Sequence, residues 1–366
     1  MKCLFPLFVF FVLCSNQAQS QGCIAVRNIV GFGQFALPEN DVSAEPVKWL
    51  VNVNSRYFTS FKTYNGNEHV YEADEDLKTN HVFVTDLSLT RMLENGWSIS
   101  LDVPITTANR TSWQEHGNDA ADKTQYTTRA VGISDIRLTL YKWLMDVSTY
   151  HKGNIQLGLG LKLPTGNYHS EDYFHRSTGL VLAPVNQSIQ LGDGGTGFTF
   201  ELNSYYTFNK TISFYGNLFY LLSPKDQNGT SSTLGNPASQ ASINATANIN
   251  SVPDGYTARA GASFAVKNFS FSAGARVEGS PVHDVIGESN GGRRSGYIVS
   301  IEPGVNYKFK KSILYAYVPV PFYKTTKLTV PDQRLIDAGV ILPPTNTQSA
   351  GGFADYMIFL GLLIKM

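Results

Sequence analysis

Residues 153–166 of the chain, GNIQLGLGLKLPTG, alternate strictly between two kinds of side chain. Branched aliphatic residues occupy every second position from Ile155 to Leu163, and small, polar or charged residues stand between them. This period predicts a β-strand, because successive side chains of a strand point to opposite faces. Hydrocarbon on one face and polar groups on the other are typical of a membrane β-barrel, although a strand of a soluble sandwich has the same period.

Repetition of this pattern along the chain favours the barrel. About twelve strand-like segments follow residue 46: 48–61, 82–93, 97–106, 133–144, 153–166, 198–208, 212–222, 256–266, 269–278, 297–309, 314–322 and 355–365. Short turns between them alternate with long polar loops at 62–80, 108–130, 167–195, 223–253, 280–294 and 324–352. Outer-membrane barrels have short periplasmic turns and long extracellular loops. We therefore predict an all-β fold, a transmembrane antiparallel up-and-down β-barrel over residues 47–366.

The turns also predict which strand positions face each other. Side chains alternate, so a two-residue turn must switch the outward set between even and odd positions. At Lys267-Asn268 the outward set does change from even to odd numbers, and this register places Arg259 directly opposite Arg276. Pro303 lies inside a predicted strand, where it removes a ladder hydrogen bond, and we expect a bulge there.

The first residues predict export from the cytoplasm. Residues 1–20 combine Lys2, an apolar core and an Ala-Gln-Ser cleavage site, as a signal peptide does. Cys23 then remains as the single cysteine, and its lipid modification is the alternative to a plain thiol. Residues 21–46 have no clear period and predict a periplasmic or lumen-inserted segment. No later segment has the ~18 consecutive apolar residues of a membrane-spanning helix.

Composition and motifs do not indicate an enzyme. The chain has no formal net charge and 16% charged residues, which argues against a nucleic-acid partner. The segment 192–197, GDGGTG, looks like a phosphate loop, but it precedes a predicted strand and lacks the Gly-Lys-Ser/Thr ending. His169 and His175 flank two acidic residues, yet solvated loop residues are the more frequent explanation. Ser55 and His81 lie too far apart for catalysis. We predict neither cofactor nor metal.

Charged residues on the predicted inner face are the candidate site. Like charges opposite each other, as at Arg259 and Arg276, are unfavourable unless something is bound between or beside them. Glu278 lies two residues from Arg276 on the same face, and Lys162 is expected near Asp135. Either these groups brace the barrel wall or they form a constriction that selects solutes. The candidate residues are Arg137, Asp135, Lys162, Glu201, Arg259, Arg276, Glu278 and Glu302.

Several short motifs resemble one family. They are GISDIRL at 132–138, LGLKLPTG at 159–166, GDGGTG at 192–197, ARVEG at 275–279, the segment 296–305 and VPV at 318–320. In this order they resemble the MetA-pathway phenol-degradation family of outer-membrane proteins, from about residue 102 to the C-terminus. The resemblance implies an outer-membrane channel for aromatic or other hydrophobic compounds. The chain departs from the usual aromatic ending of outer-membrane barrels by finishing on Met366.

The functional prediction is a passive outer-membrane channel or transporter for small, hydrophobic or aromatic compounds. The alternative is a plugged structural or surface-binding barrel without transport. Eight strands are filled by side chains and sixteen or more leave an aqueous channel, so twelve strands leave both alternatives open. The expected partners are outer-membrane lipid, the barrel-assembly machinery and a small-molecule solute.

Overall fold

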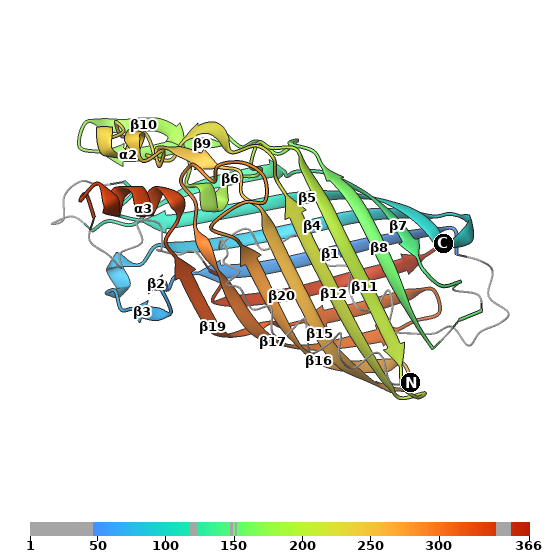
Figure 1. Cartoon of the computed structure of the whole chain (residues 1–366). Coiled ribbons are helices and arrows are strands. Elements are labelled where there is room, and N and C mark those ends of the chain that lie inside the picture. Colours follow the sequence, from blue (N-terminus) through green and yellow to red (C-terminus); the bar gives the residue numbers. More distant parts are fainter. Residues whose placement is uncertain (1–46, 117–122, 147–148, 151, 342–352) are drawn as a thin grey trace.

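The protein forms a closed β-barrel of twelve antiparallel strands, seen in a computed structural model (Figure 1). The structure describes residues 47–116, 123–146, 149–150, 152–341 and 353–366. The predicted signal peptide at 1–20, the segment 21–46 and Cys23 lie outside the described residues. The described residues confirm the predicted architecture.

Each wall strand is antiparallel to its neighbours, and pairing of β1 with β20 and of β16 with β17 closes the cylinder. The wall consists of β1 (Trp49–Ser60), β4 (Thr79–Met92), β5 (Trp97–Ser112), β6 (Tyr126–Ile133) with β7 (Arg137–Trp143), β8 (Gly153–Lys162), β11 (Gly197–Thr207), β12 (Ile212–Leu222), β15 (Gly255–Val266), β16 (Phe269–Ser280), β17 (Ser295–Lys308), β18 (Ser312–Tyr317) with β19 (Val320–Lys327), and β20 (Tyr356–Lys365).

The predicted register is correct where the tight turns allowed it to be derived. Arg259 pairs with Arg276 across the β15–β16 hairpin, and Val266 pairs with Phe269 beside the turn. At the β4–β5 turn, Asn95 adopts a positive φ of 56°, which Asn tolerates better than most residues. Turn sequence and alternation together therefore determine which side chains enter the lumen.

The expected bulge at Pro303 is absent, because β16 and β17 stay in regular register on either side of it. On its other side, β17 faces β18 and β19, and Pro303 lies opposite the interruption between them. There the Pro303 carbonyl accepts a hydrogen bond from the Val318 N–H at 3.1 Å. The missing N–H of Pro303 therefore costs no ladder bond. A register shift occurs instead between Val299 and Ser300, opposite β19.

The expected loops are shorter and more structured than the sequence suggested. Strands β5, β6 and β19 extend into them, and the fourth and eleventh strands are each interrupted once. The loops also contain β2 (Thr63–Asn65), β3 (Glu68–Val70), η2 (Asp74–Asp76), β9 (Glu171–Arg176), β10 (Gly179–Pro184), η4 (Gln187–Ile189), β13 (Gln227–Ser231), α2 (Gln240–Asn244), β14 (Ile249–Ser251) and α3 (Val330–Asp337). In the described ranges, no helix has the length and apolar character needed to cross a bilayer.

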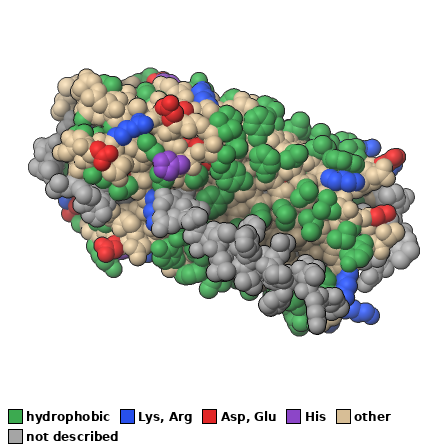
Figure 2. Space-filling view, in the orientation of Figure 1, with side chains coloured by type: hydrophobic (Ala, Val, Ile, Leu, Met, Phe, Trp, Pro, Cys, Tyr) green, Lys and Arg blue, Asp and Glu red, His purple; other side chains and the backbone are tan. Residues whose placement is uncertain are grey.

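The outer wall is apolar and the inner face is polar. Hydrophobic side chains cover the wall between the loop end and the turn end (Figure 2). Leu159 at the centre of β8 is 62% exposed, whereas Asn203 on the inner face of β11 is 1% exposed. This division follows the alternation of the sequence and turns the polar groups toward the lumen.

Candidate functional site in the barrel lumen

The first group of lumen charges joins β15, β16 and β17. Arg259 Nε lies 2.8 Å from Glu302 Oε1, and Arg276 Nη1 lies 3.4 Å from the other oxygen of the same carboxylate. Arg276 Nε also donates to Glu278 at 3.0 Å. All four side chains are buried. The two opposed guanidinium groups are therefore held by carboxylates of the protein itself.

A second group lies across the lumen on β5, β7 and β11. Arg137 Nη2 lies 3.2 Å from Asp102 Oδ2, and its Nη1 lies 3.4 Å from Glu201 Oε1. The Tyr141 hydroxyl donates to the second oxygen of Glu201 at 2.9 Å. These contacts tie three wall strands together through one guanidinium group.

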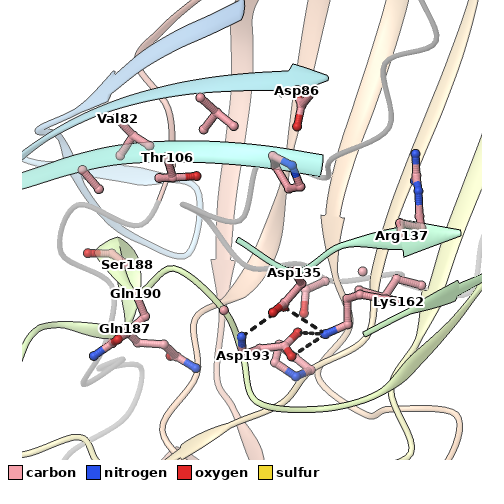
Figure 3. A pocket seen from close by; sticks show the side chains of 18 of the residues that line it. Val82, Asp86, Thr106, Asp135, Arg137, Lys162, Gln187, Ser188, Gln190 and Asp193 are labelled. Carbon is pink, nitrogen blue, oxygen red and sulfur yellow. Dashed lines mark hydrogen bonds and ion pairs between the residues drawn. The ribbon is translucent and has the colours of Figure 1, made fainter. Parts of the chain in front are cut away.

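The third group forms where the wall is interrupted between β6 and β7 (Figure 3). Lys162 Nζ lies 3.5 Å from Asp135 Oδ2 and also contacts the carboxylate of Asp193. The Asp135 carboxylate accepts hydrogen bonds from the backbone N–H groups of Gly166 at 3.0 Å and of Asp193 at 3.3 Å. Asp135 therefore links the strand interruption to the loop that enters β11.

Tyrosines fill part of the lumen on the side of the short turns. The rings of Tyr315 and Tyr317 lie over Gly361 and Gly304, at positions where any side chain would collide with them. The Tyr215 hydroxyl lies in the same way against glycines of β15 and β16. The glycines therefore create room for these rings against the inner wall.

A cavity of about 120 Å³ remains toward the loop end, and its lining is partly apolar and partly charged. Phe58, Val82, Val84 and Ile189 supply apolar surface, while charged groups of the second and third groups supply the polar surface. Ile189 belongs to η4, a short helix of the 163–196 connection that folds into the barrel and contacts β4 and β5. The cavity is thus formed jointly by the wall and an inward-folded loop.

The loops above this cavity are joined to one another. Arg110 on β5 binds Glu115 at 2.7 Å, and the same carboxylate accepts a hydrogen bond from Asn186 at 3.0 Å. Arg294, in the loop between β16 and β17, donates to the amide oxygen of Asn186 at 2.9 Å. Three loops therefore meet at one point over the lumen.

The histidines of the loops pack on aromatic rings. His116 is 1% exposed and stacks on Phe174, while His175 stacks on Tyr126 with 3.8 Å between ring centres. His169 Nδ1 lies 3.2 Å from the Thr230 hydroxyl. Burial lowers the pKa of His116 from 6.5 to about 4, so this ring is neutral at physiological pH. The described residues contain no cluster of three or more metal-ligating side chains.

The structure brings the eight candidate residues into three ion-pair groups. Arg137 and Lys162, which belong to different groups, lie directly opposite each other on the neighbouring strands β7 and β8. Sequence reasoning missed Asp193, which was treated as part of a loop-to-strand connection. It also missed the apolar part of the cavity lining, because only charged residues of the inner face were considered as candidates, whereas Val82 and Val84 are buried inner-face residues of β4. Their even residue numbers, which place them on the inner face of β4, were the available signal.

The barrel is similar to solved outer-membrane proteins. It aligns with the COG4313 outer membrane channel from Pseudomonas putida F1 at a TM-score of 0.56 and 13% identity, over 89% of this chain and 98% of that chain. This similarity shows that the fold is that of an outer-membrane β-barrel. The Ralstonia pickettii toluene transporter TbuX aligns over 88% of this chain and 90% of that chain, with 10% identity and a TM-score of 0.40. No protein-family model and no curated protein matches the sequence.

Proposed function

We propose that this outer-membrane barrel is a passive channel or transporter for small hydrophobic or aromatic compounds. The observation that carries the proposal is the mixed lining of the cavity, which combines apolar side chains such as Phe58 and Val84 with charged ones such as Arg137. Ligand sites combine mostly apolar walls with a few placed polar groups, as this cavity does. The motif resemblance to the MetA-pathway family adds support for aromatic solutes.

Solute uptake into proteoliposomes tests this function. Phenol and glucose serve as the aromatic and the hydrophilic probe, and the intact barrel should accelerate phenol entry over protein-free liposomes. Val84→Trp should slow this entry because the ring fills the cavity. Leu87→Trp is the matched control, because Leu87 lies on the same strand, faces outward and is 40% exposed. Phenol entry that equals the protein-free rate would end the proposal.

The alternative is a plugged structural barrel, and the lumen filling favours it. The Arg259–Glu302–Arg276 group braces neighbouring strands, and the tyrosines occupy the turn-side lumen. In this alternative the eight candidate residues hold the wall together. In the channel they form a charged constriction. Planar-bilayer recordings separate the two: Arg276→Ala should change ion selectivity in a channel, whereas a plugged barrel conducts nothing.

We also infer how the chain reaches its membrane. The sequence of residues 1–20 supports export and cleavage after Ser20, followed by insertion through the barrel-assembly machinery into outer-membrane lipid. Membrane fractionation should recover the mature chain in the outer membrane as a heat-modifiable band. Its measured mass should equal that of a chain that starts at Gln21. Recovery as a soluble periplasmic protein would contradict this location.

A further inference from the structure

Among the described residues, three arginine side chains of the lumen lie against aromatic rings. Two of these pairs are internal to the barrel. Arg259 Cζ lies 5.5 Å from the ring centre of Tyr317, and Arg276 Cζ lies 5.4 Å from that of Phe359. Both rings are 1% exposed, and neither pair lines the cavity. A solute in the cavity therefore does not meet these two guanidinium groups.

The third pair borders the cavity. Arg137 Cζ lies 5.5 Å from the centre of the Phe219 ring, and both residues line the cavity. The Arg137 side chain is 11% exposed, and it points away from the Lys162 ion pairs (Figure 3). Its guanidinium group is therefore within reach of a solute that enters the cavity.

Two carboxylates hold the edges of the Arg137 guanidinium group. Nε and Nη2 donate to Asp102 Oδ2 at 3.4 and 3.2 Å, and Nη1 lies 3.4 Å from Glu201 Oε1. The N–H groups of a guanidinium lie in its plane, so carboxylates occupy its edges, whereas aromatic rings stack on its flat faces. The two acids therefore fix the position of the cation without using the surface on which a ring would stack.

The size and charge of the cavity limit what it can hold. Its volume of about 120 Å³ is close to the roughly 150 Å³ of an apolar protein cavity that takes up benzene. Five aspartates but three basic side chains line it, and this excess of acidic groups disfavours a solute that carries a carboxylate. The cavity therefore suits a single uncharged ring.

We propose that the cavity selects neutral, electron-rich aromatic rings, which stack on the guanidinium group of Arg137. This inference rests on the proposed function and narrows its solute class. A cation attracts the negative face of an aromatic ring, and the attraction is stronger in a site shielded from water. A saturated ring of the same size has no such face. Arg137 thus distinguishes an aromatic solute from an aliphatic one of similar apolar area, which apolar residues such as Val84 do not.

Calorimetric titration of the detergent-solubilised full chain tests this preference. The probes are benzyl alcohol, pentafluorobenzyl alcohol and cyclohexylmethanol, which share a hydroxymethyl group on a six-membered ring. Val84→Trp, which fills the cavity, is the reference for partitioning into detergent. Benzyl alcohol should bind roughly threefold to thirtyfold more tightly than the other two, because fluorination reverses the charge of the ring face and saturation removes that face. A purely apolar cavity gives the opposite order, since both other probes are more hydrophobic than benzyl alcohol.

Paired substitutions test the assignment to Arg137. Arg137→Gln/Glu201→Gln removes the cation together with one of its carboxylates and should abolish the preference for benzyl alcohol. Lys324→Gln/Asp355→Asn is the matched control and should keep it. Lys324 lies 5.4 Å from the Tyr64 ring centre and pairs with Asp355, but none of these three residues lines the cavity. Heat-modifiability on gels confirms that each variant is folded.

The outcomes separate this inference from the proposed function. If cyclohexylmethanol or pentafluorobenzyl alcohol binds the intact barrel as tightly as benzyl alcohol, and Val84→Trp still removes binding, the stacking is overturned and the channel stands. Heats equal to those of Val84→Trp for all three probes overturn both. A preference that persists in folded Arg137→Gln/Glu201→Gln overturns the role of Arg137, and if this variant does not fold, the order of the probes on the intact barrel decides. Tighter binding of benzoate than of benzyl alcohol overturns the restriction to neutral solutes.

Discussion

Arg259 and Arg276 face each other across a tight hairpin and bind the same carboxylate, that of Glu302. One guanidinium group contacts each oxygen, so Glu302 offsets a repulsion that the β15–β16 register imposes. Glu278 contacts one of the two guanidinium groups, that of Arg276. The two carboxylates therefore make unequal contributions, although both are buried and both lie on the same inner face.

This inequality predicts the effect of neutralising each acid. Glu302→Gln should lower the free energy of unfolding by about 3–5 kcal/mol, because it leaves opposed buried charges with one remaining partner. Glu278→Gln should cost less, since Arg276 keeps Glu302. Urea unfolding of the two variants from lipid vesicles gives the comparison. Equal midpoints for both variants would show that Glu302 does not act as the shared partner.

The lipid-facing wall predicts a depth dependence. Leu159→Arg should destabilise the barrel by about 2–4 kcal/mol, because the charge meets hydrocarbon at the centre of β8. Phe208→Arg is the control: Phe208 is equally exposed, at 62%, but lies beside a short turn, where a charge costs about 0–1 kcal/mol. Folding titrations from vesicles measure both. Similar losses at the two positions would contradict the assigned membrane level.

The loop packing around His116 predicts a loss of order at low pH. The unfolded loop takes up a proton near pH 6.5, whereas the packed loop, with a pKa of about 4, does not. The stabilisation is therefore complete above pH 6.5 and is lost as the pH falls toward 4. Glu115, His175, Arg176 and Asp172 supply the charges around the ring.

Hydrogen exchange of the His175 amide measures this effect, because that N–H donates to Nδ1 of His116 at 3.2 Å. Protection, corrected for the intrinsic rate, should fall between pH 6.5 and 4 in the intact protein. His116→Phe keeps an aromatic ring in place and should remove the dependence on pH. A flat protection profile in the intact protein would contradict the prediction.

The tyrosine filling predicts a change in conductance. Tyr315→Ala removes a ring that is 2% exposed and fills the lumen over Gly361, so ion flow through the turn-side half should increase. Leu314→Ala serves as the control, because Leu314 is the neighbouring residue, faces outward and is 42% exposed. Single-channel recordings measure both. Unchanged conductance in Tyr315→Ala would place the limiting barrier elsewhere in the chain.

Alternation and turn length were sufficient to predict the barrel and its registers, because a strand period of two fixes the inward set once one turn is known. The pairing of Arg259 with Arg276 in the β15–β16 register followed directly from this rule. The interruptions beside Ser134 and Val318 were not predicted, because they depend on neighbouring strands and loops rather than on local pattern. The pairing of Pro303 with the second interruption is an example, since only the fold shows that its missing N–H faces that gap.

The cavity was harder to predict than the wall. The apolar part of its lining forms only when η4 folds back over Val82 and Val84. The 167–195 loop has neither a two-residue nor a helical period that would indicate this folding back into the barrel. The ion pair of Lys162 with Asp193 was missed for the same reason. The two residues belong to different strand ends and meet only when the barrel is closed. Contacts between loops and wall depend on the closed cylinder, which the sequence pattern does not describe.

The seam between β1 and β20 has a consequence for the order of folding. It joins Leu50 to Lys365 and continues through Thr59 and Tyr356, so it pairs segments separated by most of the chain. Contacts of such long range require a large loss of chain entropy before they add stability, and they form slowly. Until the last strand arrives, the edge of β1 presents unpaired backbone groups. The chain therefore depends on protection of that edge between its synthesis and its closure in the membrane.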